Sequence, residues 1–188
     1  MKKIMFNDRY DLTQAVIEGR KTMTRRIVPT KTRLRRALAV IHDEPHGSEQ
    51  EEYLKSAYYK VGEIVAVAQN YSSFYNILDN TRPIPEGAGW DNKMFVRADL
   101  MPHQIRITGI KCERLQDISD KECLREGIRQ FTPNFPKNFP IHPTHFVVGD
   151  ILKDTPREAF ASLIDKVSGK GTWASNPWVV AYEFELVK

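Results

Sequence analysis

Cysteine is scarce in this chain, and it contains no long apolar run. The two cysteines among 188 residues, Cys112 and Cys123, are too few and too scattered for a disulfide framework or a cysteine-based zinc site. No apolar stretch approaches the roughly 18 to 20 residues that a membrane-spanning helix needs. The opening Met-Lys-Lys resembles the start of a signal peptide, but polar and charged residues interrupt any apolar run from Asn7 onward. We therefore expect a cytoplasmic protein without a membrane partner.

Motifs of several enzyme classes are also missing. The chain has no Walker-type phosphate loop, no dinucleotide-binding glycine fingerprint and no Gly-x-Ser-x-Gly elbow. Two histidine pairs, His42 with His46 and His142 with His145, have spacings that a metal site can use. Each pair lies beside prolines and lacks a convincing third ligand. We therefore expect neither a metal nor a cofactor.

Positive charge is concentrated in one segment. The net charge is only +4, yet eight cations and no acid lie between positions 20 and 36: Arg20, Lys21, Arg25, Arg26, Lys31, Arg33, Arg35 and Arg36. The rest of the chain has 20 cations against 24 acids, a net charge of −4. Such a segment suits a phosphate-bearing partner, for which we expect one continuous basic surface from Arg20 to Arg36. The simpler interpretation is a solvated basic face.

Hydrophobic spacing and capping residues predict four helices. They are a helix at 7–18 closed by Gly19, a short basic helix at 31–40, a short helix after Ser119 that stops before Gly127, and a helix from Pro156 that Gly169 closes. Ser119 and Glu122 match a capping box, and Thr155 and Glu158 repeat the pattern with Pro156 at the first helical position.

Strands are predicted at 63–69, 94–98, 105–115 and 178–187, where β-branched and apolar residues dominate. Alternation in the last of these is typical of a half-buried strand. The acidic run at 41–58 indicates an exposed insertion, and the proline- and phenylalanine-rich run at 129–150 indicates a long loop. We expect a single domain spanning 1–188, of the mixed α+β class, built around a small and mostly antiparallel sheet or barrel.

Four segments together resemble the ASCH-domain family. They are "FNDRYDLTQAVIEGRKTMTRRI" at the start, then "YKVGEIVAV", then "IRITGIKCERLQDISDKECLREGI", and finally "NPWVVAYEFELV". The first carries the family's helix ending in Gly-Arg-Lys-Thr followed by Thr and Arg. The matches are in order and span almost the whole chain, and the acidic insertion and the proline-rich loop are the main departures.

The resemblance implies a PUA-like fold, a small curved antiparallel barrel flanked by helices and related to RNA-binding modules. Such proteins occur in bacteria, phages and mobile elements. Small bacterial members are associated with amide hydrolysis on N4-acylated cytidines, and the family motif places the catalytic residues at Lys21, Thr24 and Glu126. Glu122 is the alternative carboxylate, because it lies one helical turn from Glu126. The expected partner is a modified nucleoside or RNA, bound by a monomer.

The chemistry of these residues leaves three interpretations open. A neutral Lys21 can activate the Thr24 hydroxyl, but lowering its pKa from about 10.4 to about 7 costs ~4.6 kcal/mol. Burial and neighbouring arginines would lower this pKa, whereas a close Glu126 would oppose them. Alternatively, Glu126 is the general base and a charged Lys21 stabilises an oxyanion. In the third interpretation the two residues form an ion pair with a purely structural role.

A second group of residues is predicted to contact the ligand. Its members are Arg20, Thr22, Arg25, Arg26 and Asn176. The arginines can bind phosphate or the edge of a base. Asn176 can read a base, although its position before Pro177 also suits a turn. Aromatic residues in the loop-rich stretch 71–90 can stack on a base or pack in the core. The alternative to an enzyme is a non-catalytic RNA-binding module, whose affinity would fall steeply with salt.

Overall fold

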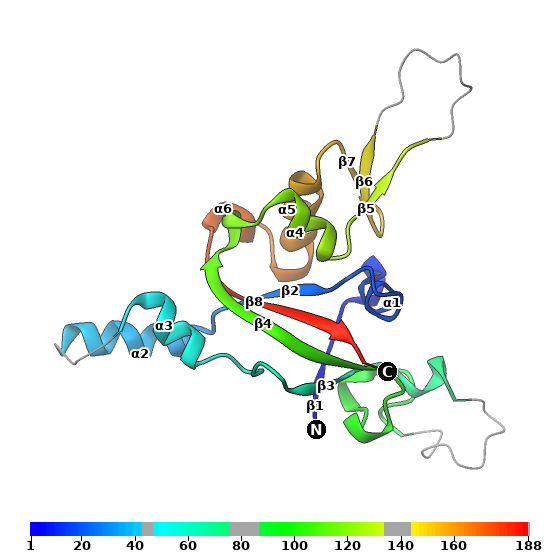
Figure 1. Ribbon diagram of the computed structural model, residues 1–188, viewed down its shortest axis with the longest axis horizontal. Coiled ribbons are helices and arrows are strands. Elements are labelled where there is room, and N and C mark those ends of the chain that lie inside the picture. The colour runs from blue at the N-terminus through cyan, green and yellow to red at the C-terminus, as the bar shows by residue number, and fades with distance from the viewer. Residues whose placement is uncertain (43–46, 76–86, 134–143, 188) are drawn as a thin grey trace.

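The computed structural model describes residues 1–42, 47–75, 87–133 and 144–187. Its centre is a five-stranded sheet in the order β1-β3-β4-β8-β2 (Figure 1). The strands are β1 (Lys2–Ile4), β2 (Met23–Ile27), β3 (Ile64–Val67), β4 (Gln104–Arg114) and β8 (Trp178–Leu186). Only the β1–β3 pair is parallel, and the other three neighbouring pairs are antiparallel. The structure is therefore mixed α+β.

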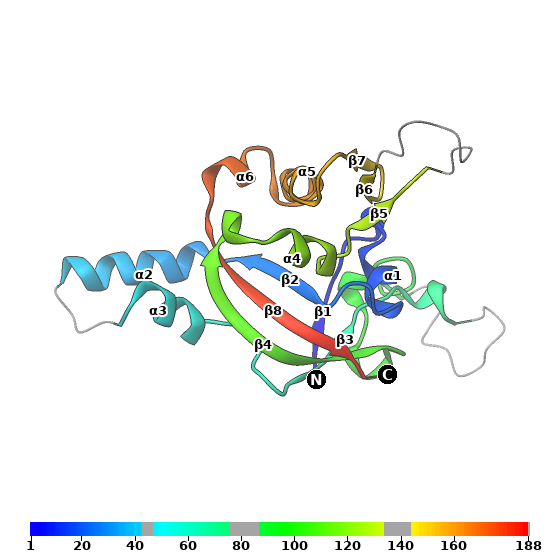
Figure 2. The ribbon, with the colours of Figure 1, turned by 45° about the horizontal axis from the view of Figure 1, so that its top comes forward.

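The sheet is strongly curved. The long strands β4 and β8 bend together (Figures 1 and 2), and their register shifts between Ile107 and Gly109. Such a bulge increases local twist and bends the strand. The edge strands β1 and β2 do not pair with each other within the described residues. Instead, Arg26 of β2 donates a hydrogen bond from Nη2 to the carbonyl of Met5, just beyond β1, at 2.6 Å. The described residues thus form an open, curved sheet rather than a closed barrel.

One group of helices and a small second sheet lie on one side of the central sheet (Figure 2). The helices are α1 (Leu12–Ile17), α4 (Asp120–Arg125), α5 (Pro156–Ser168) and α6 (Thr172–Ser175), and the small antiparallel sheet is β5 (Arg129–Phe131), β6 (His145–Val148) and β7 (Ile151–Lys153). Helix α5 packs on α4, α6, β6 and β7 through its buried stripe of Ala159, Phe160 and Leu163. The stripe joins the main core, which includes Val65, Ile105 and most of β8.

Helices α2 (Thr30–Ile41) and α3 (Glu49–Lys55) project from the body as an arm (Figures 1 and 2). Ser48 is the N-cap of α3, and its hydroxyl accepts from the Glu51 amide in a capping box. Helix α2 has no side-chain cap, because its N-terminal flanking residue is Pro29. No helix in the described ranges is long and apolar enough to cross a membrane.

Short 3₁₀ turns connect these elements. They are η1 (Asp8–Tyr10), η2 (Tyr71–Ser73), η3 (Lys93–Phe95), η4 (Ala98–Leu100) and η5 (Leu115–Asp117). Two of them replace predicted structure. The strand predicted at 94–98 is wrong, because that stretch lies in η3 and η4 and the link between them. The helix predicted from position 7 begins at Leu12 instead, because Asp11 adopts a left-handed conformation (φ 60°) that separates η1 from α1.

The capping predictions are confirmed. Ser119 and Glu122 form the capping box of α4, and Thr155 caps α5 by accepting from the Glu158 amide. The half-buried pattern predicted for β8 is wrong, because 179–182 are all buried, as in a central strand covered on both faces. The predicted insertion at 41–58 contains α3, and 43–46 lie outside the described residues. The loop predicted at 129–150 is wrong at both ends, because β5 and β6 lie inside this range and pair with each other, and 134–143 lie outside the described residues.

Candidate functional site

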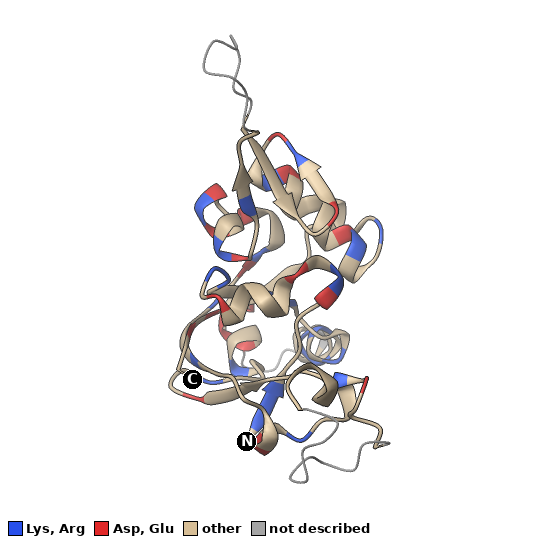
Figure 3. Ribbon diagram, turned by 90° about the vertical axis from the view of Figure 1, so that its right-hand side faces the viewer, with Lys and Arg blue, Asp and Glu red and all other residues tan. Residues whose placement is uncertain are grey.

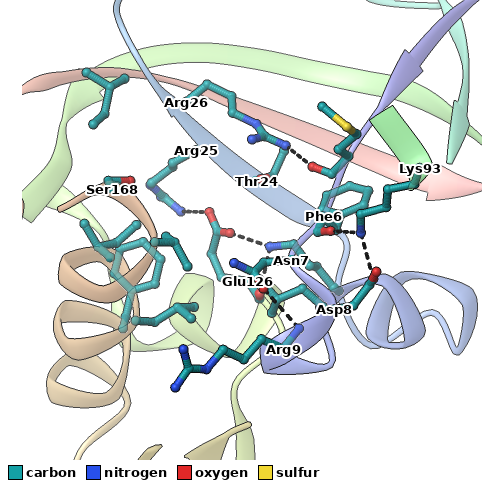
Figure 4. Close-up of a pocket in the computed structure, with 18 residues that line it drawn as sticks. Phe6, Asn7, Asp8, Arg9, Thr24, Arg25, Arg26, Lys93, Glu126 and Ser168 are labelled. Carbon is teal, nitrogen blue, oxygen red and sulfur yellow. Dashed lines mark hydrogen bonds and ion pairs between the residues drawn. The ribbon is translucent and has the colours of Figure 1, made fainter. Parts of the chain in front are cut away.

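A cavity of about 740 Å³ lies along the free edge of β2. Because β2 is an edge strand, side chains from both of its faces can reach the cavity. Opposite walls come from the segment that follows β1, from the end of α4 and from α5 (Figure 4). The lining residues with the greatest chemical interest are Phe6, Lys21, Thr24, Arg25, Arg26 and Glu126. Parts of the chain that are distant in sequence therefore meet at this cavity.

Lys21 is buried, with an exposed fraction of 2%, and its ammonium group is fully hydrogen-bonded. Nζ donates to Glu126 Oε2 at 2.6 Å, to the Glu126 carbonyl at 2.7 Å and to the Met23 carbonyl at 2.8 Å. Three acceptors match the three N–H groups of a charged ammonium, whereas a neutral amine has only two donors and one lone pair. The geometry therefore fits the charged form of Lys21.

The local backbone explains how Lys21 comes to lie on the end of α4. Gly19 ends α1 in the left-handed region (φ 71°), as predicted, and the Lys21 amide then donates to the Ala15 carbonyl. At the end of α4, Gly127 has φ 104°. A Cβ atom on Gly127 would lie 3.2 Å from Leu12 Cδ2 and 3.5 Å from Lys21 Cδ. Glycine is thus needed for its conformation, and it also leaves room for Lys21.

The Glu126 carboxylate is shared between two cations. Its second oxygen, Oε1, lies 3.1 Å from Arg25 Nη1 (Figure 4). Arg25 Nη2 lies 2.7 Å from Glu113 Oε1 and 3.1 Å from Glu122 Oε2. Lys111, beside α4, completes the chain of ion pairs by contacting both Glu113 and Glu122. Three cations and three carboxylates therefore form one continuous network with no net charge.

This network separates the two candidate carboxylates. Glu126 contacts Lys21 and lines the cavity, whereas Glu122 contacts Arg25 and Lys111 and does not line it. Of the two candidates, Glu126 is therefore the carboxylate that lies at the cavity. Glu122 stabilises the far side of the arginine.

Burial and pairing shift the pKa values of this network in opposite ways. Burial lowers the pKa of Lys21 below its ordinary value; Glu126 opposes this shift, and Arg26 and Arg25 add to it. Burial would raise the pKa of Glu122, but hydrogen bonds from Lys111 and from the Ser119 backbone, together with Arg25, lower it to about 2. Glu122 is thus held as a carboxylate, while Lys21 is made easier to deprotonate.

Thr24 lies in the middle of β2, opposite Tyr182 of β8. Its side chain is buried in the protein and lines the cavity. Within the described residues, the Thr24 hydroxyl makes no hydrogen bond, to Lys21, Glu126 or any other group. It remains available to a bound ligand.

Three residues predicted to bind ligand lie outside this cavity. Arg20 pairs instead with Glu18 at 2.6 Å and with Asp11 at 3.1 Å. The Thr22 hydroxyl, just before β2, accepts a hydrogen bond from Nε of Arg125, the last residue of α4, at 3.1 Å. Asn176 adopts a left-handed conformation, and its side chain accepts from the Gln116 amide at 2.8 Å, at the start of β8.

The aromatic residues between positions 71 and 90 pack together rather than line the cavity. Tyr71 is buried in a second, smaller core cluster with Val96 and Met101, and Phe74, Tyr75 and Trp90 pack against it. Of the two interpretations of these aromatics, the structure therefore favours core packing.

Sequence reasoning missed most of the wall opposite β2. Phe6, Asn7, Arg9 and the apolar face of α5 all line the cavity. Phe6 comes directly before the first helical turn and lies inside the opening motif, but no spacing rule marks it as a wall residue. The apolar stripe of α5 predicted a helix, but it gave no indication that this helix lines a cavity.

A buried carboxylate can accept and return a proton, and the two cations that flank it can stabilise negative charge. The unbonded Thr24 hydroxyl lines the same cavity. Within the described residues, no three side chains of the metal-binding types are grouped as a metal site. No protein-family model, curated protein or solved structure matches this chain. Its function must therefore be inferred from the geometry of this cavity.

Proposed function

We propose that this protein is an ASCH-type, PUA-like hydrolase that removes the acyl group from N4-acylated cytidine. The observation that carries the proposal is the meeting of Lys21, Thr24 and Glu126 at one cavity. Two of the positions come from the opening motif and the third from a helix end about 100 residues later, and their meeting at one cavity supports the proposal. The cavity volume of about 740 Å³ is also within the range of about 300 to 1,000 Å³ that is typical of small-molecule sites.

The cavity walls suit a nucleoside. Phe6 and the apolar side of α5, with Phe160 and Leu163, offer a surface for a base. Arg9, Arg26 and Asn7 supply polar groups around this surface. A mixed wall of this kind can orient a base that is flat and apolar on its faces and polar at its edge.

The hydrogen bonds of Lys21 support the mechanism in which Glu126 is the general base and Lys21 acts as a cation. All three of its N–H groups are already used, so no lone pair is available for a base. Glu126 is then the group that carries the proton, and its four lone-pair sites leave room for a further hydrogen. In the free protein Thr24 is not bonded to Glu126, and such catalytic bonds often tighten only when substrate is bound.

In the proposed reaction the Thr24 hydroxyl oxygen attacks the acyl carbon of the exocyclic amide. The hydroxyl proton moves to Glu126. The positive charge of Lys21, whose N–H groups stay bonded to the protein, stabilises the oxyanion electrostatically. Collapse breaks the C–N bond, and the leaving amino group takes the proton from Glu126 to release cytidine. Water, activated by the same carboxylate, then cleaves the acyl–threonine ester. The products are cytidine and the free carboxylic acid.

The decisive experiment is acetate release from N4-acetylcytidine by the wild-type protein and by Thr24→Val. The substitution removes the hydroxyl but keeps the shape, and we expect kcat to fall at least ~100-fold. Thr22→Val is the matched control, because Thr22 is in the same segment but outside the cavity. It should retain wild-type turnover.

Two results would argue against this function. Absence of turnover in the folded wild-type protein would remove the hydrolase assignment. Equal turnover in Thr24→Val would exclude the hydroxyl as the nucleophile. Lys21→Ala is less informative here, because it also leaves Glu126 without its buried partner.

A second candidate is the non-catalytic RNA-binding module. The observation in its favour is the arm, where Lys31, Arg33 and Arg35 are exposed and form no ion pair within the described residues. This function predicts salt-dependent RNA binding without acetate release.

A further inference from the structure

A second cavity, of about 280 Å³, adjoins the first. The two share the side chains of Met5, Arg26 and Ile27, so a short partition separates them. The second cavity lies between β2 and the link from α3 to β3, and its lining includes Tyr58, Tyr59 and Tyr182. We refer to it as the tyrosine cavity. Its volume is near the lower end of the range for ligand sites, about 300 Å³, which suits a single ring system.

Two of the three tyrosines are fixed by the protein. Tyr59 is buried, donates its hydroxyl to the Lys3 carbonyl at 2.9 Å, and packs edge-to-face on Tyr58 and Tyr182. The Tyr182 hydroxyl accepts from the Tyr58 amide at 3.0 Å. Tyr58 differs, because 63% of it is exposed and its hydroxyl has no hydrogen-bond partner in the described part of the chain. Its ring does contact Lys2, whose Nζ lies 4.7 Å from the ring centroid. The one exposed ring, that of Tyr58, therefore packs on the buried ring of Tyr59, which in turn packs on Tyr182.

Arg26 lies at the partition. One N–H of Nη2 is bonded to the Met5 carbonyl, and this bond fixes the guanidinium between the two cavities. Nε and Nη1 have no partner among the described residues, although a guanidinium carries five donors. Free, oriented N–H groups of arginine suit a phosphate.

The tyrosine cavity leads to the basic arm. Pro29, the residue that precedes α2, is one of its walls. Beyond it, the exposed cations Lys31, Arg33 and Arg35 follow on α2, which contains no acid. Figure 3 shows Lys and Arg in blue and Asp and Glu in red, and charges of both signs are spread over the ribbon of the rest of the protein.

From this arrangement we infer that the protein binds single-stranded RNA, with consecutive nucleotides in the two cavities. One nucleoside occupies the large cavity, the neighbouring base stacks on Tyr58, and the phosphate between them binds Arg26. The rest of the strand follows the cations of α2. This inference rests on the proposed function for the large cavity and adds a second base-binding site to it.

Stacking and charge together favour RNA over other occupants. Exposed aromatic rings bind unpaired bases with little sequence preference, and cationic grooves follow the backbone. A free nucleoside would use the large cavity and leave Tyr58 and Arg26 without a ligand. An apolar protein segment would fill the tyrosine cavity but would not use the free N–H groups of Arg26.

The test is fluorescence anisotropy with a labelled six-cytidine RNA, measured at low salt for four proteins. They are the wild type, Tyr58→Ala, Tyr58→Phe and Phe95→Ala. Tyr58→Ala should weaken binding ~10-fold or more, because it removes one stacking ring. Tyr58→Phe keeps the ring and should bind like the wild type. Phe95→Ala removes a ring of similar exposure (58%) that lines neither cavity, and it should have no effect.

Acetate release from N4-acetylcytidine is measured on the same proteins. Tyr58→Ala should leave this turnover unchanged, because the free nucleoside does not reach the tyrosine cavity. The inference is overturned if the wild type does not bind the RNA, or if Tyr58→Ala binds it as tightly as the wild type. Tyr58-dependent RNA binding without acetate release would instead overturn the hydrolase function and support the second site.

Discussion

The basic segment divides into two halves that the fold treats in opposite ways. In the first half, Lys21 and Arg25 are buried and paired with carboxylates, and Arg20 pairs with two acids of its own helix region. In the second half, the cations of α2 are mostly exposed and form no ion pair within the described residues. The continuous basic surface predicted from Arg20 to Arg36 is therefore not present.

The difference shows that local charge in a sequence does not measure surface charge. The acids that neutralise Lys21 and Arg25 are Glu113, Glu122 and Glu126, roughly 90 to 100 residues further along the chain. A buried ion pair has a large desolvation cost, so it is weak support for stability by itself. Its presence beside a cavity agrees better with a role in binding or chemistry. The exposed half has no such cost and remains available to a partner.

The largest effect is expected from breaking the buried half. Glu126→Gln leaves Lys21 and Arg25 with a neutral amide where both had a carboxylate. Removing one partner of a buried pair typically costs about 3 to 5 kcal/mol, because the remaining charge stays buried without compensation. Urea unfolding at pH 7 measures this loss of free energy.

The matched control for this change is Glu183→Gln. Glu183 pairs with Arg125 at 3.1 Å, but both side chains are about one third exposed. Pairs in water contribute about 0 to 1 kcal/mol, so the control should unfold nearly as the wild type does. Similar losses in the two variants would contradict the distinction between buried and exposed charge in this protein.

The second expected effect is on the pH dependence of stability, and it concerns Glu122 in the same buried network. The pKa of Glu122 is about 2 in the folded protein, below its ordinary value of 4.5, so the unfolded chain takes up the proton more readily. The stabilisation from Glu122 is therefore complete well above pH 4.5 and is lost as the pH falls towards 2. At about 1.4 kcal/mol per pKa unit, the loss amounts to at most ~4 kcal/mol, and solvent screening of the partly exposed side chain reduces it.

Urea unfolding between about pH 5 and pH 2.5 measures this effect in the wild type and in Glu122→Gln. The variant has no titrating group at this position, so its stability should fall less steeply with acid over that interval. Parallel slopes for the two proteins would show that Glu122 is not held in its ionised form. The slope is compared rather than the absolute stability, since the substitution also weakens the contacts of Lys111 and Arg25.

Local signals predicted the elements that depend on neighbours in sequence. The caps at Ser119 and Thr155 involve residues three positions apart, and the α5 stripe repeats within one helix, so both could be predicted from the chain. Their content of β-branched and apolar residues located β4 and β8 within one or two residues. The strand predicted at 94–98 is absent. Val96 is the one buried residue of this stretch, and it packs in the second core cluster without pairing to another strand.

The site was predicted only in part, and for a physical reason. The resemblance to a family placed Lys21, Thr24 and Glu126 together, whereas no spacing rule relates positions so far apart. The role of Arg25 as the link between Glu126, Glu113 and Glu122 depends on how α4 packs on β2. Similarly, the burial of all residues from Val179 to Tyr182 depends on what covers each face of the sheet.

The smallest effect on stability, and the most specific one on binding, is expected in the exposed half. Replacing Lys31, Arg33 and Arg35 by Gln should change the free energy of unfolding by less than about 0.5 kcal/mol, because these side chains are exposed and form no ion pair within the described residues. If they bind RNA phosphates, removing each cation lowers the slope of log K against log salt by ~0.7 for a single strand. A triple variant of Lys121, Lys153 and Lys170 removes the same charge from exposed positions outside the arm. An equal decrease in affinity in both triple variants would mean that net charge, and not the arm, attracts the RNA.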